Sequence, residues 1–337
     1  ITLTPDDVVN KRKIPLKLHH EVISANFGNK TVTIRDIKQK REFEQSYDYL
    51  FLGTGAKPIV PSQFDVDSNH PRVVKVHTLD QTKEIRETLE QSNGTIKTVA
   101  IVGVGFIGQE MLQAYKNFTS IQNIIAVGPL RPFSGKLQNI FKSKLKEKNI
   151  THIDDYVKNV SENRNNSLNL HMGNGEAIEA DLVQYSVGVR PNTEAFQNSG
   201  LKMLENGAIV VDEFCRTNVN GVYAAGDCAT VRHKILNEHH YIPLAPAANR
   251  LGRLAGAHMS GKNPDPFPGV VGTAIWKCFD LHCAQTGITQ DMAEKLNLNA
   301  ESVTITNREV AHYYPIDDKM TITLRFNPDS HKVLGCE

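Results

Sequence analysis

The sequence contains no apolar run long enough to cross a membrane and no excess of charge of either sign. Its longest apolar stretch, residues 99–108, is interrupted by glycines and is much shorter than the roughly 20 residues that a transmembrane helix needs. Lys and Arg total 38 against 37 for Asp and Glu, which gives a net charge of +1. A nucleic-acid-binding protein is normally strongly basic, so we expect neither a membrane span nor a nucleic-acid partner.

Cysteine is also scarce, with five residues in 337 and no regular spacing. Five cysteines without regular spacing do not indicate a disulfide framework, so we expect a reducing, cytoplasmic setting. The opening ITLTPDDVV lacks Met and lacks the basic and apolar segments of a secretory signal. The closing LGCE resembles the beginning of a second hairpin strand, so we expect the chain to be the middle part of a longer protein.

The length of 337 residues predicts two or more domains, and 40% hydrophobic with 22% charged residues is ordinary globular usage. Short strands are predicted over residues 20–53. A helix is predicted over residues 79–91, with Leu79, Ile85 and Leu89 on one side, and it stops at Asn93-Gly94. Residues 97–118 predict a buried strand, a glycine turn and a helix, and residues 123–128 a second buried strand, which together form a βαβ unit.

The second half of the chain predicts a change from mixed to antiparallel structure. The basic amphipathic segment 136–148 is interpreted as the solvated face of a crossover helix. Residues 151–187 alternate as strands do, with a hairpin turn at 174–176, and predict a meander inserted into the α/β domain. An apolar helix over 246–260 precedes the Pro- and Gly-rich segment 261–269, a predicted domain boundary. Beyond it we expect an antiparallel sheet and one short helix over 290–296.

Gly103-Val104-Gly105-Phe106-Ile107-Gly108 follows a predicted strand and opens a predicted helix. In that context the first glycine allows a tight turn, the second lets backbone N–H groups approach a pyrophosphate, and the third lets the helix pack on the strand. The helix N-terminus adds positive potential. We therefore predict a dinucleotide-binding site.

The second strand does not decide between NADH and NADPH as the coenzyme. An acid about 20 residues beyond the glycines would hold the ribose 2′-OH of NAD, but the strand ends Val127-Gly128-Pro129-Leu130-Arg131. Arg131 would pair a 2′-phosphate, which favours NADPH, or it is simply a solvated side chain.

Two shorter motifs lie on either side of the βαβ unit. Ala225-Gly226-Asp227 places a carboxylate at a strand end, where it would accept from sugar or ribityl hydroxyls. Thr54-Gly55-Ala56 follows YDYLFL as a turn or a ligand contact. Each motif is weak alone, and their joint presence predicts a second nucleotide site.

Through these and further motifs, the chain resembles the FAD-dependent pyridine nucleotide-disulfide oxidoreductases over nearly its whole length. The motifs that carry the resemblance are YDYLFLGTGAKP, IVGVGFIGQE, SVGVRPNTE, GVYAAGDCA, IPLAPAANRLGRLAGAHMSG and GTAIWKCFDLHCAQTGIT. TPDDVVNKRKIPLKLHHEVISAN and HYYP are most similar to the coenzyme A disulfide reductase branch, which shares the rest with NADH oxidases and peroxidases. The resemblance implies an α/β fold with two Rossmann-like three-layer domains, for FAD and NAD(P), and a C-terminal α+β dimerisation domain, truncated at both ends.

The implied domains are residues 1–95 and 215–262 for FAD, 96–214 for NAD(P), and 268–337 for the interface domain. By position, Val22 would contact the FAD adenine, and Phe106 would gate the nicotinamide pocket with Glu110 close to both rings. The other implied cofactor-binding residues are Thr54, Gly55, Gly226, Asp227, Leu244 and Ala245 for FAD, and Gly103, Gly105, Ile107, Gly108, Arg131 and Gly188 for NAD(P).

The resemblance also implies an auxiliary catalytic role for Tyr313, whose alternative interpretation is a half-buried strand tyrosine. The resemblance implies that the family's redox cysteine and first FAD-binding GxGxxG would lie upstream of Ile1, and the five cysteines present are interpreted as small apolar fillers. The adjacent pairs His19-His20 and His239-His240 point apart, so no metal site is predicted.

The implied activity is hydride transfer from NAD(P)H through FAD to a disulfide, with coenzyme A disulfide as the first candidate, in a homodimer. The alternatives are an NADH oxidase or peroxidase that reduces O2 or peroxide, and a persulfide reductase on the same scaffold. A flavin-binding electron-transfer or sensing module without disulfide chemistry is the alternative from another class.

Overall fold

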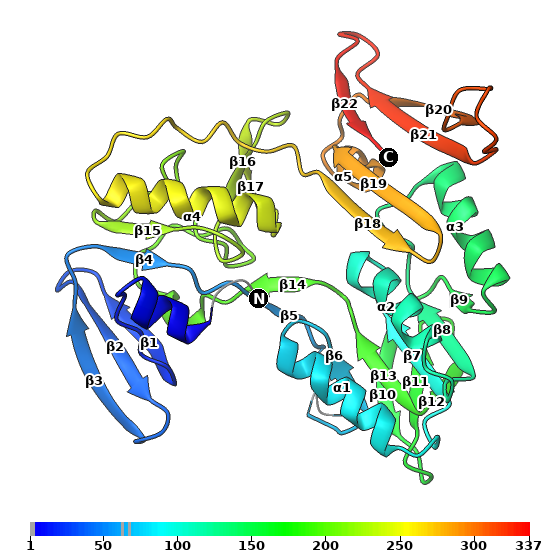
Figure 1. Cartoon of the computed structure of the whole chain (residues 1–337), viewed down its shortest axis with the longest axis horizontal. Helices are drawn as coiled ribbons and strands as arrows, with labels where there is room; N and C mark the ends of the chain where they lie inside the picture. The colour runs from blue at the N-terminus through cyan, green and yellow to red at the C-terminus, as the bar shows by residue number, and fades with distance from the viewer. Residues whose placement is uncertain (1–3, 62–63, 67–68) are drawn as a thin grey trace. The chain divides into compact units, whose positions relative to one another are not determined.

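The structure is a computed structural model that describes residues 4–61, 64–66 and 69–337. The chain divides into two compact units (Figure 1). Unit 1 comprises residues 1–55, 191–231 and 245–268, and unit 2 comprises residues 56–190, 232–244 and 269–337. Within the described ranges, no helix is both long and apolar enough to cross a membrane.

Unit 1 contains an antiparallel sheet and a separate pair of parallel strands. The antiparallel sheet has the order β1-β2-β3, from His20–Asn26, Thr31–Asp36 and Arg41–Ser46. Strands β4 (Leu50–Leu52) and β15 (Val222–Ala224) run parallel, so their carboxyl ends lie at the same edge. The predicted apolar helix is α4 (Ala245–Met259), which buries Ala247, Leu251 and Ala255 at four-residue spacing. The short helices of this unit are η1 (Asp7–Lys11) and η2 (Glu194–Phe196).

Unit 2 is built around a parallel sheet in the order β6-β13-β7-β8-β9. Its strands are Val73–Lys75, Leu182–Tyr185, Thr98–Val102, Asn123–Val127 and Thr151–Ile153. The predicted strand, turn and helix are confirmed as β7 and α2 (Phe106–Lys116), and the basic segment is the crossover helix α3 (Gly135–Glu147). This parallel sheet with crossover helices is the predicted α/β, Rossmann-type class.

The two faces of the parallel sheet are covered by different layers. Val99 and Ile101 of β7 pack in one core with residues of α1 (Leu79–Gln91), α2 and α3. Ala100 and Val102 pack in a second core with the antiparallel sheet β10-β11-β12. The strands of that sheet are Val157–Glu162, Leu168–Met172 and Ala177–Ala180. Successive side chains of β7 therefore face opposite layers, and the result is a three-layer arrangement.

The predicted helix over residues 79–91 is confirmed as α1, and side-chain hydrogen bonds cap its first turn. The Thr78 hydroxyl accepts from Gln81 N, and Gln81 Oε1 accepts from Thr78 N, both at 3.2 Å. Ile85 and Leu89 are buried as expected. Leu79, the first helical residue, is by contrast 53% exposed.

The predicted meander over residues 151–187 was partly wrong. The hairpin turn at 174–176 joins β11 to β12 as expected, but β9 and β13 belong to the parallel sheet. Residues 182–185 of β13 are all buried, and they pair in parallel with Val99–Val102 of β7. A strand buried on both faces is typical of the centre of a parallel sheet. Gln184 interrupts the apolar residues of β13, so the sequence did not distinguish this strand from the alternating strands before it.

The C-terminal part of unit 2 is an antiparallel sheet in the order β18-β19-β22-β21-β20. Its strands are Ala274–Cys278, Leu281–Gly287, Val333–Cys336, Lys319–Phe326 and Glu301–Arg308, and its helix is α5 (Gln290–Lys295). This agrees with the predicted sheet and short helix. The small pairs are β5 (Ala56–Pro58) with β14 (Val189–Pro191), and β16 (Val231–His233) with β17 (Glu238–His240).

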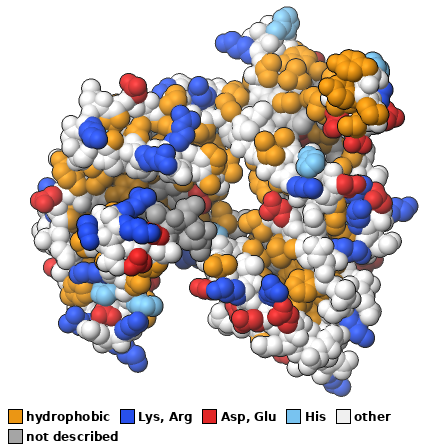
Figure 2. All heavy atoms as spheres, in the orientation of Figure 1, with side chains coloured by type: hydrophobic (Ala, Val, Ile, Leu, Met, Phe, Trp, Pro, Cys, Tyr) orange, Lys and Arg blue, Asp and Glu red, His pale blue; other side chains and the backbone are white. Residues whose placement is uncertain are grey.

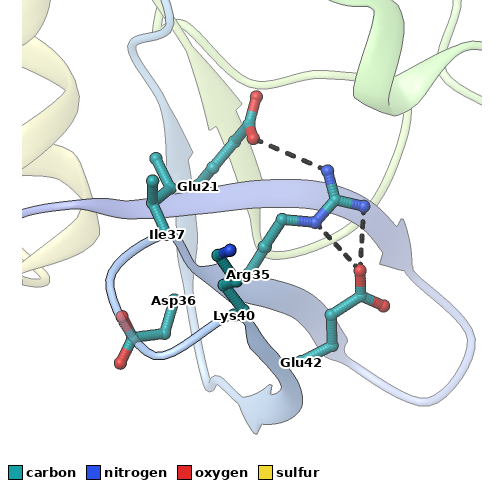
Figure 3. Close-up of a pocket in the computed structure, with 6 residues that line it drawn as sticks. All are labelled: Glu21, Arg35, Asp36, Ile37, Lys40 and Glu42. Carbon is teal, nitrogen blue, oxygen red and sulfur yellow. Dashed lines mark hydrogen bonds and ion pairs between the residues drawn. The ribbon is translucent and has the colours of Figure 1, made fainter.

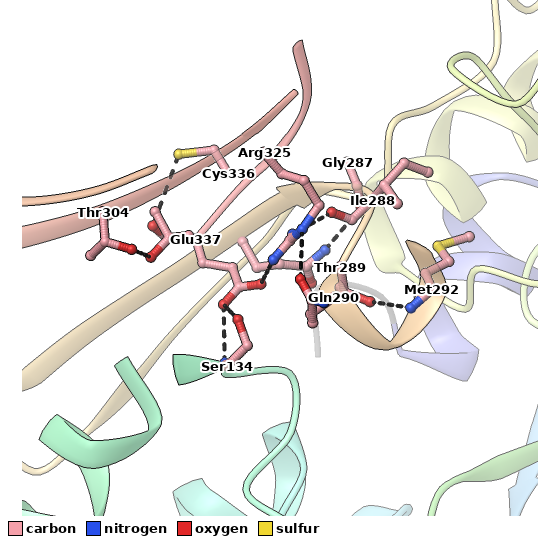
Figure 4. A network of polar contacts seen from close by, with 12 residues as sticks. Ser134, Gly287, Ile288, Thr289, Gln290, Met292, Thr304, Arg325, Cys336 and Glu337 are labelled. Carbon is pink, nitrogen blue, oxygen red and sulfur yellow. Dashed lines mark hydrogen bonds and ion pairs between the residues drawn. The ribbon is translucent and has the colours of Figure 1, made fainter. Parts of the chain in front are cut away.

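A buried polar network fixes this sheet to the start of α3 (Figure 4). Arg325 of β21 donates to Ile288 O at 2.7 Å and to Glu337 Oε1 at 3.1 Å. Glu337 Oε2 in turn accepts from the backbone N and the hydroxyl of Ser134, both at 3.2 Å. Ser134 is the N-cap of α3, so the carboxylate satisfies a donor at a helix N-terminus, where negative charge is favoured.

The unit boundary at Pro268–Gly269 falls inside the Pro- and Gly-rich segment. The packing units differ from the domain limits predicted from the sequence, because residues 191–214 pack in unit 1. Cofactor domains are defined by what they bind, so the limits 1–95, 96–214, 215–262 and 268–337 stay a prediction.

Candidate functional site

The glycine-rich turn lies between the end of β7 and the first turn of α2. Gly103 has φ +96°, and a Cβ atom added there would lie 2.5 Å from Ser186 O. A Cβ atom on Gly108 would lie 2.1 Å from Gly103 O, so the helix approaches the strand end too closely for a side chain. A Cβ atom on Gly105, by contrast, meets nothing within 4 Å. The turn thus has two glycines required by the fold and a third that borders open space, at the position predicted for a pyrophosphate.

The carboxyl ends of the central parallel strands converge on this turn. Gly103 N donates to Val127 O at 2.8 Å, and Ser186 N donates to Val102 O at 2.7 Å. Strand β8 lies on one side of β7 and β13 on the other, so the strand order reverses beside Gly103. Open α/β sheets bind ligands at such a switch point, and the N-terminus of α2 supplies positive potential there.

The predicted NAD(P) residues occupy the first turn of α2 and the ends of the neighbouring strands. Phe106 is 36% and Ile107 37% exposed, and Glu110 is also exposed, whereas Gly108 is buried. Gly188 lies beyond the end of β13 with φ +113°, and its carbonyl accepts from Ile59 N at 2.9 Å. The structure therefore brings the glycine turn and the β13 end to one edge, and the roles of the individual side chains stay predictions.

Arg131 follows β8 and is already paired. Its Nε lies 2.9 Å from Asp291 Oδ2, with the two side chains 59% and 47% exposed. An ion pair this exposed contributes little, so it does not prevent the guanidinium from taking another anion. The prediction that Arg131 holds a 2′-phosphate remains a prediction.

The two weak motifs of unit 1 meet at one edge. Leu52 of β4 pairs with Ala224 of β15, and Ala225 N donates to Leu52 O at 3.2 Å. The segments that follow, Thr54-Gly55 and Gly226-Asp227, therefore leave adjacent parallel strand ends. Burial raises the pKa of the Cys228 thiol, and hydrogen bonds from the Thr54 side chain and the Gly55 backbone oppose that shift.

The remaining predicted FAD residues lie on elements of the expected kind. Val22 sits on β1 at a bulge and packs against the core that contains Leu52. Ala245 is the first residue of α4, directly after Leu244, so both stand at a helix N-terminus. That end of a helix attracts an electron-rich ligand group, which fits the predicted position beside a flavin.

Tyr313 lies in an exposed turn between β20 and β21 with 83% of its side chain exposed. The alternative interpretation, a half-buried strand tyrosine, was wrong. Arg308 holds the turn, because its Nη2 donates to Ile316 O at 2.6 Å and its Nε lies 3.2 Å from Asp317. An exposed phenol on a fixed turn is free to meet a substrate or a second chain.

The cysteines occupy packing positions, and all five are free thiols. Cys215, Cys228, Cys278 and Cys283 are buried. Burial raises the pKa of Cys215 and of Cys278 to about 12, and that of Cys283 to about 11. These three thiols stay protonated near neutral pH and are poor nucleophiles, which agrees with their interpretation as apolar fillers.

Gln109 and Trp276 were missed by the analysis of the sequence. Gln109 is fully buried in α2, and its Oε1 accepts from Trp276 Nε1 at 2.7 Å. A polar residue at an inward helix position was the one local signal, but its partner lies on β18 in another sheet. Such a pairing is set by packing and not by spacing along the chain.

A shallow cavity of about 380 Å³ lies on the β1-β2-β3 sheet (Figure 3). Arg35 at its centre donates to Glu42 at 2.8 and 2.9 Å and lies 4.0 Å from Glu21. Three carboxylates and two cations line this cavity, so it has no excess of positive charge, and none of its six lining residues is a predicted site residue.

Each unit thus brings a glycine-containing loop to the ends of parallel strands, which is the usual position of a nucleotide in an α/β fold. A family model described as pyridine nucleotide-disulphide oxidoreductase matches residues 6–252. The chain belongs to this family. FAD and NAD(P)H, the predicted cofactors, are those of the family.

Similar proteins bear more specific names. The NAD(P)H sulfur oxidoreductase (CoA-dependent) of Pyrococcus furiosus is 31% identical over 99% of this chain and 74% of its own. The coenzyme A disulfide reductase of Staphylococcus aureus is 25% identical over 99% of this chain and 74% of its own. The structure of an NAD-dependent persulfide reductase from A. fulgidus is 28% identical with a TM-score of 0.90, covering 99% of this chain and 61% of that one. The chain thus spans less than two thirds of that solved relative.

Proposed function

We propose that the chain forms the nucleotide-binding and interface parts of a flavoprotein that passes a hydride from NAD(P)H through FAD to a disulfide. Coenzyme A disulfide is the first candidate substrate. The observation that carries the proposal is the open space beside Gly105 at the strand switch point, next to a helix N-terminus. The name of the Staphylococcus relative supports the choice of substrate.

The residues of the two strand-end sites have separate tasks in this proposal. The backbone at Gly105 and the start of α2 hold the dinucleotide pyrophosphate, while Phe106 covers the nicotinamide and Glu110 lies near it. Thr54, Gly55, Gly226 and Asp227 hold the flavin nucleotide, with Val22 at the adenine and Leu244 and Ala245 near the pyrimidine. FAD, when bound, accepts the hydride and supplies the electrons that reduce a disulfide.

Tyr313 would assist the departure of the thiol. A tyrosine hydroxyl carries an O–H donor, so it is able to donate a proton to a departing sulfur. The redox cysteine of the proposal is none of the five in this chain, and a reducing, cytoplasmic setting agrees with five free thiols.

A homodimer is part of the proposal, because the β20-β21 hairpin has an uncovered apolar face. Val303 and Ile305 of β20 and Met320 of β21 are 50%, 58% and 48% exposed. The strand register places these side chains on one face, and Figure 2 shows hydrophobic side chains gathered over this hairpin. A second copy would cover that face.

The test uses the protein as it is encoded, purified with FAD. Under anaerobic conditions, NADH or NADPH should bleach the flavin absorbance, and coenzyme A disulfide should restore it with release of coenzyme A thiol. Flavin that is not bleached by either nucleotide would contradict the proposal. Flavin that is bleached but reoxidised by no disulfide, persulfide, peroxide or O2 would favour a sensing or electron-transfer module.

A persulfide reductase is the second candidate. The Pyrococcus sulfur oxidoreductase and the A. fulgidus persulfide reductase support it, since both are more similar to this chain than the Staphylococcus disulfide reductase is. Reoxidation by coenzyme A persulfide faster than by coenzyme A disulfide, with sulfide released, would select it. Rapid reoxidation by O2 or peroxide alone would instead select the oxidase or peroxidase alternative.

A further inference from the structure

The side chain of Trp276 joins the C-terminal sheet to the dinucleotide turn through Gln109. Trp276 is 5% exposed, and its indole N–H donates to Gln109 Oε1 at 2.7 Å. The amide nitrogen of Gln109 donates to Val104 O at 3.0 Å and to Arg131 O at 2.8 Å. Both amide protons and the amide oxygen of a fully buried side chain are therefore paired.

The two carbonyl groups belong to the two loops that border the predicted NAD(P)H site. Val104 lies inside the glycine-rich turn, and Arg131 lies in the segment that follows β8. One side chain thus fixes the loop expected to hold the pyrophosphate and the loop expected at the ribose. Because the amide is buried, its removal would cost each carbonyl a buried hydrogen bond, which is unfavourable.

The indole of Trp276 also contacts the aromatic side chains around the same turn. Its ring centroid lies 4.6 Å from that of Phe106 at an interplanar angle of 72°. It lies 5.3 Å from that of Phe133. Edge-to-face contacts of this kind hold a ring in one orientation. Phe106 is 36% exposed, so one part of its ring packs on Trp276 while another part is open to a ligand.

We propose that Trp276 and Gln109 are positioning residues of the NAD(P)H site. Trp276 orients Phe106 by contact and orients Gln109 by its hydrogen bond, and Gln109 holds the two loops. The C-terminal sheet is then a part of the dinucleotide site. This inference rests on the proposed function, because it requires that NAD(P)H binds at Gly103–Gly108. A site whose loops are held before the ligand arrives loses less freedom on binding and binds more tightly.

Trp276 is the one tryptophan of the sequence, so its fluorescence reports directly on this site. Titration of the chain with NADH and NADPH, with excitation selective for tryptophan, should change the emission and give a dissociation constant for each nucleotide. Gln109→Leu should raise these constants about tenfold. Trp276→Phe, measured by calorimetry because it lacks the fluorophore, should raise them by a similar factor.

The double variant separates positioning from general destabilisation. If the two residues act in one network, Trp276→Phe combined with Gln109→Leu should bind no more weakly than the weaker single variant. If the two substitutions acted independently, their factors on the dissociation constant would instead multiply. Ile275→Ala is the matched control, since Ile275 precedes Trp276 on β18 and is 79% exposed, and it should bind as the parent does.

The outcomes distinguish the inference from the proposed function. If the parent chain binds neither nucleotide, the proposed function is wrong and the inference is wrong with it. If the parent binds and folded Trp276→Phe binds equally well, only the inference is overturned. Should Gln109→Leu fail to fold, Trp276→Phe decides, because it keeps an aromatic ring beside Phe106 and removes the indole N–H donor. Weaker binding with unchanged flavin absorbance would support the positioning role.

Discussion

The guanidinium of Arg325 lies 3.1 Å from the carboxylate of Glu337, and the side chains of both are 1% exposed. Each group has further partners, Ile288 O and Gln290 Oε1 for Arg325 and Ser134 for Glu337. Burying two charges carries a large desolvation cost. Removing one member of the pair therefore lowers the free energy of unfolding, because the other charge stays buried without its partner. This pair connects β21 and the end of β22 to the N-terminus of α3.

Arg325→Met should lower the free energy of unfolding by about 3–5 kcal/mol, because it leaves the Glu337 carboxylate buried without its cation. Urea unfolding followed by circular dichroism measures the change. Arg86→Met is the matched control, since the Arg86–Glu90 pair is 73% and 54% exposed, and it should leave the free energy of unfolding nearly unchanged. A loss below about 1 kcal/mol for Arg325→Met would contradict the importance of this network.

Gly105→Ala should weaken nucleotide binding with little effect on stability, whereas Gly108→Ala should destabilise the fold. A Cβ on Gly105 meets nothing within 4 Å, so the variant should lose about 1 kcal/mol or less yet bind NADH at least about tenfold more weakly. A Cβ on Gly108 would lie 2.1 Å from Gly103 O, so that variant should be destabilised by more than about 2 kcal/mol. Thermal unfolding and nucleotide titration give both quantities. Unaltered nucleotide binding by Gly105→Ala would place the pyrophosphate elsewhere.

His233 should make stability fall in mild acid. Burial, and next the imidazole of His240, lower the pKa of His233 below its ordinary value of about 6.5. Below pH 6.5 the unfolded chain therefore binds a proton that the folded chain does not, and the free energy of unfolding falls as pH falls. The fall ends below the folded pKa, and its slope for one proton is at most about 1.4 kcal/mol per pH unit.

Unfolding of His233→Gln between pH 5 and 7.5 tests this, since the variant should show a flatter profile than the parent. His331→Gln, which changes an exposed histidine, should keep the parent profile. Identical slopes for the parent and His233→Gln would show that other groups produce the acid dependence.

The buried thiols should resist modification in the folded chain. The pKa values of about 12 for Cys215 and Cys278, raised by burial, leave almost no thiolate at pH 7.5. Reaction with a chromogenic disulfide should therefore titrate at most one thiol quickly in buffer and all five in denaturant. Rapid reaction of Cys278 in the folded chain, identified by mass spectrometry, would revive it as a redox candidate.

Tyr313→Phe should slow disulfide turnover in the protein as it is encoded while leaving flavin reduction by NAD(P)H intact. The hydroxyl is the proton donor in the proposal, and general acid catalysis contributes typically 10²–10⁴-fold, so a fall of at least about tenfold is expected. The side chain is 83% exposed, so stability should change by less than ~0.5 kcal/mol. Stopped-flow flavin reduction and steady-state turnover separate the two steps. An unchanged disulfide rate would remove Tyr313 from the mechanism.

Local signals in the sequence predicted the elements that hold the site. The Asn93-Gly94 turn follows the end of α1, and the glycines of residues 103–108 delimit β7 and α2. These features are predictable because they arise from backbone preferences within a few residues. The place of β13 was not predicted, since strand alternation does not state which sheet a strand joins.

The sequence by itself therefore determined the family, the α/β class, the glycine turn at the dinucleotide site and the short motifs beside it. Only the tertiary structure decided that Thr54-Gly55 and Gly226-Asp227 leave adjacent strand ends, that Tyr313 is exposed, and that Trp276 reaches Gln109. The physical reason is the range of the interactions. Turns and helix starts are stabilised by neighbours along the chain, whereas buried side-chain pairs form between elements distant in sequence, where packing selects the partner.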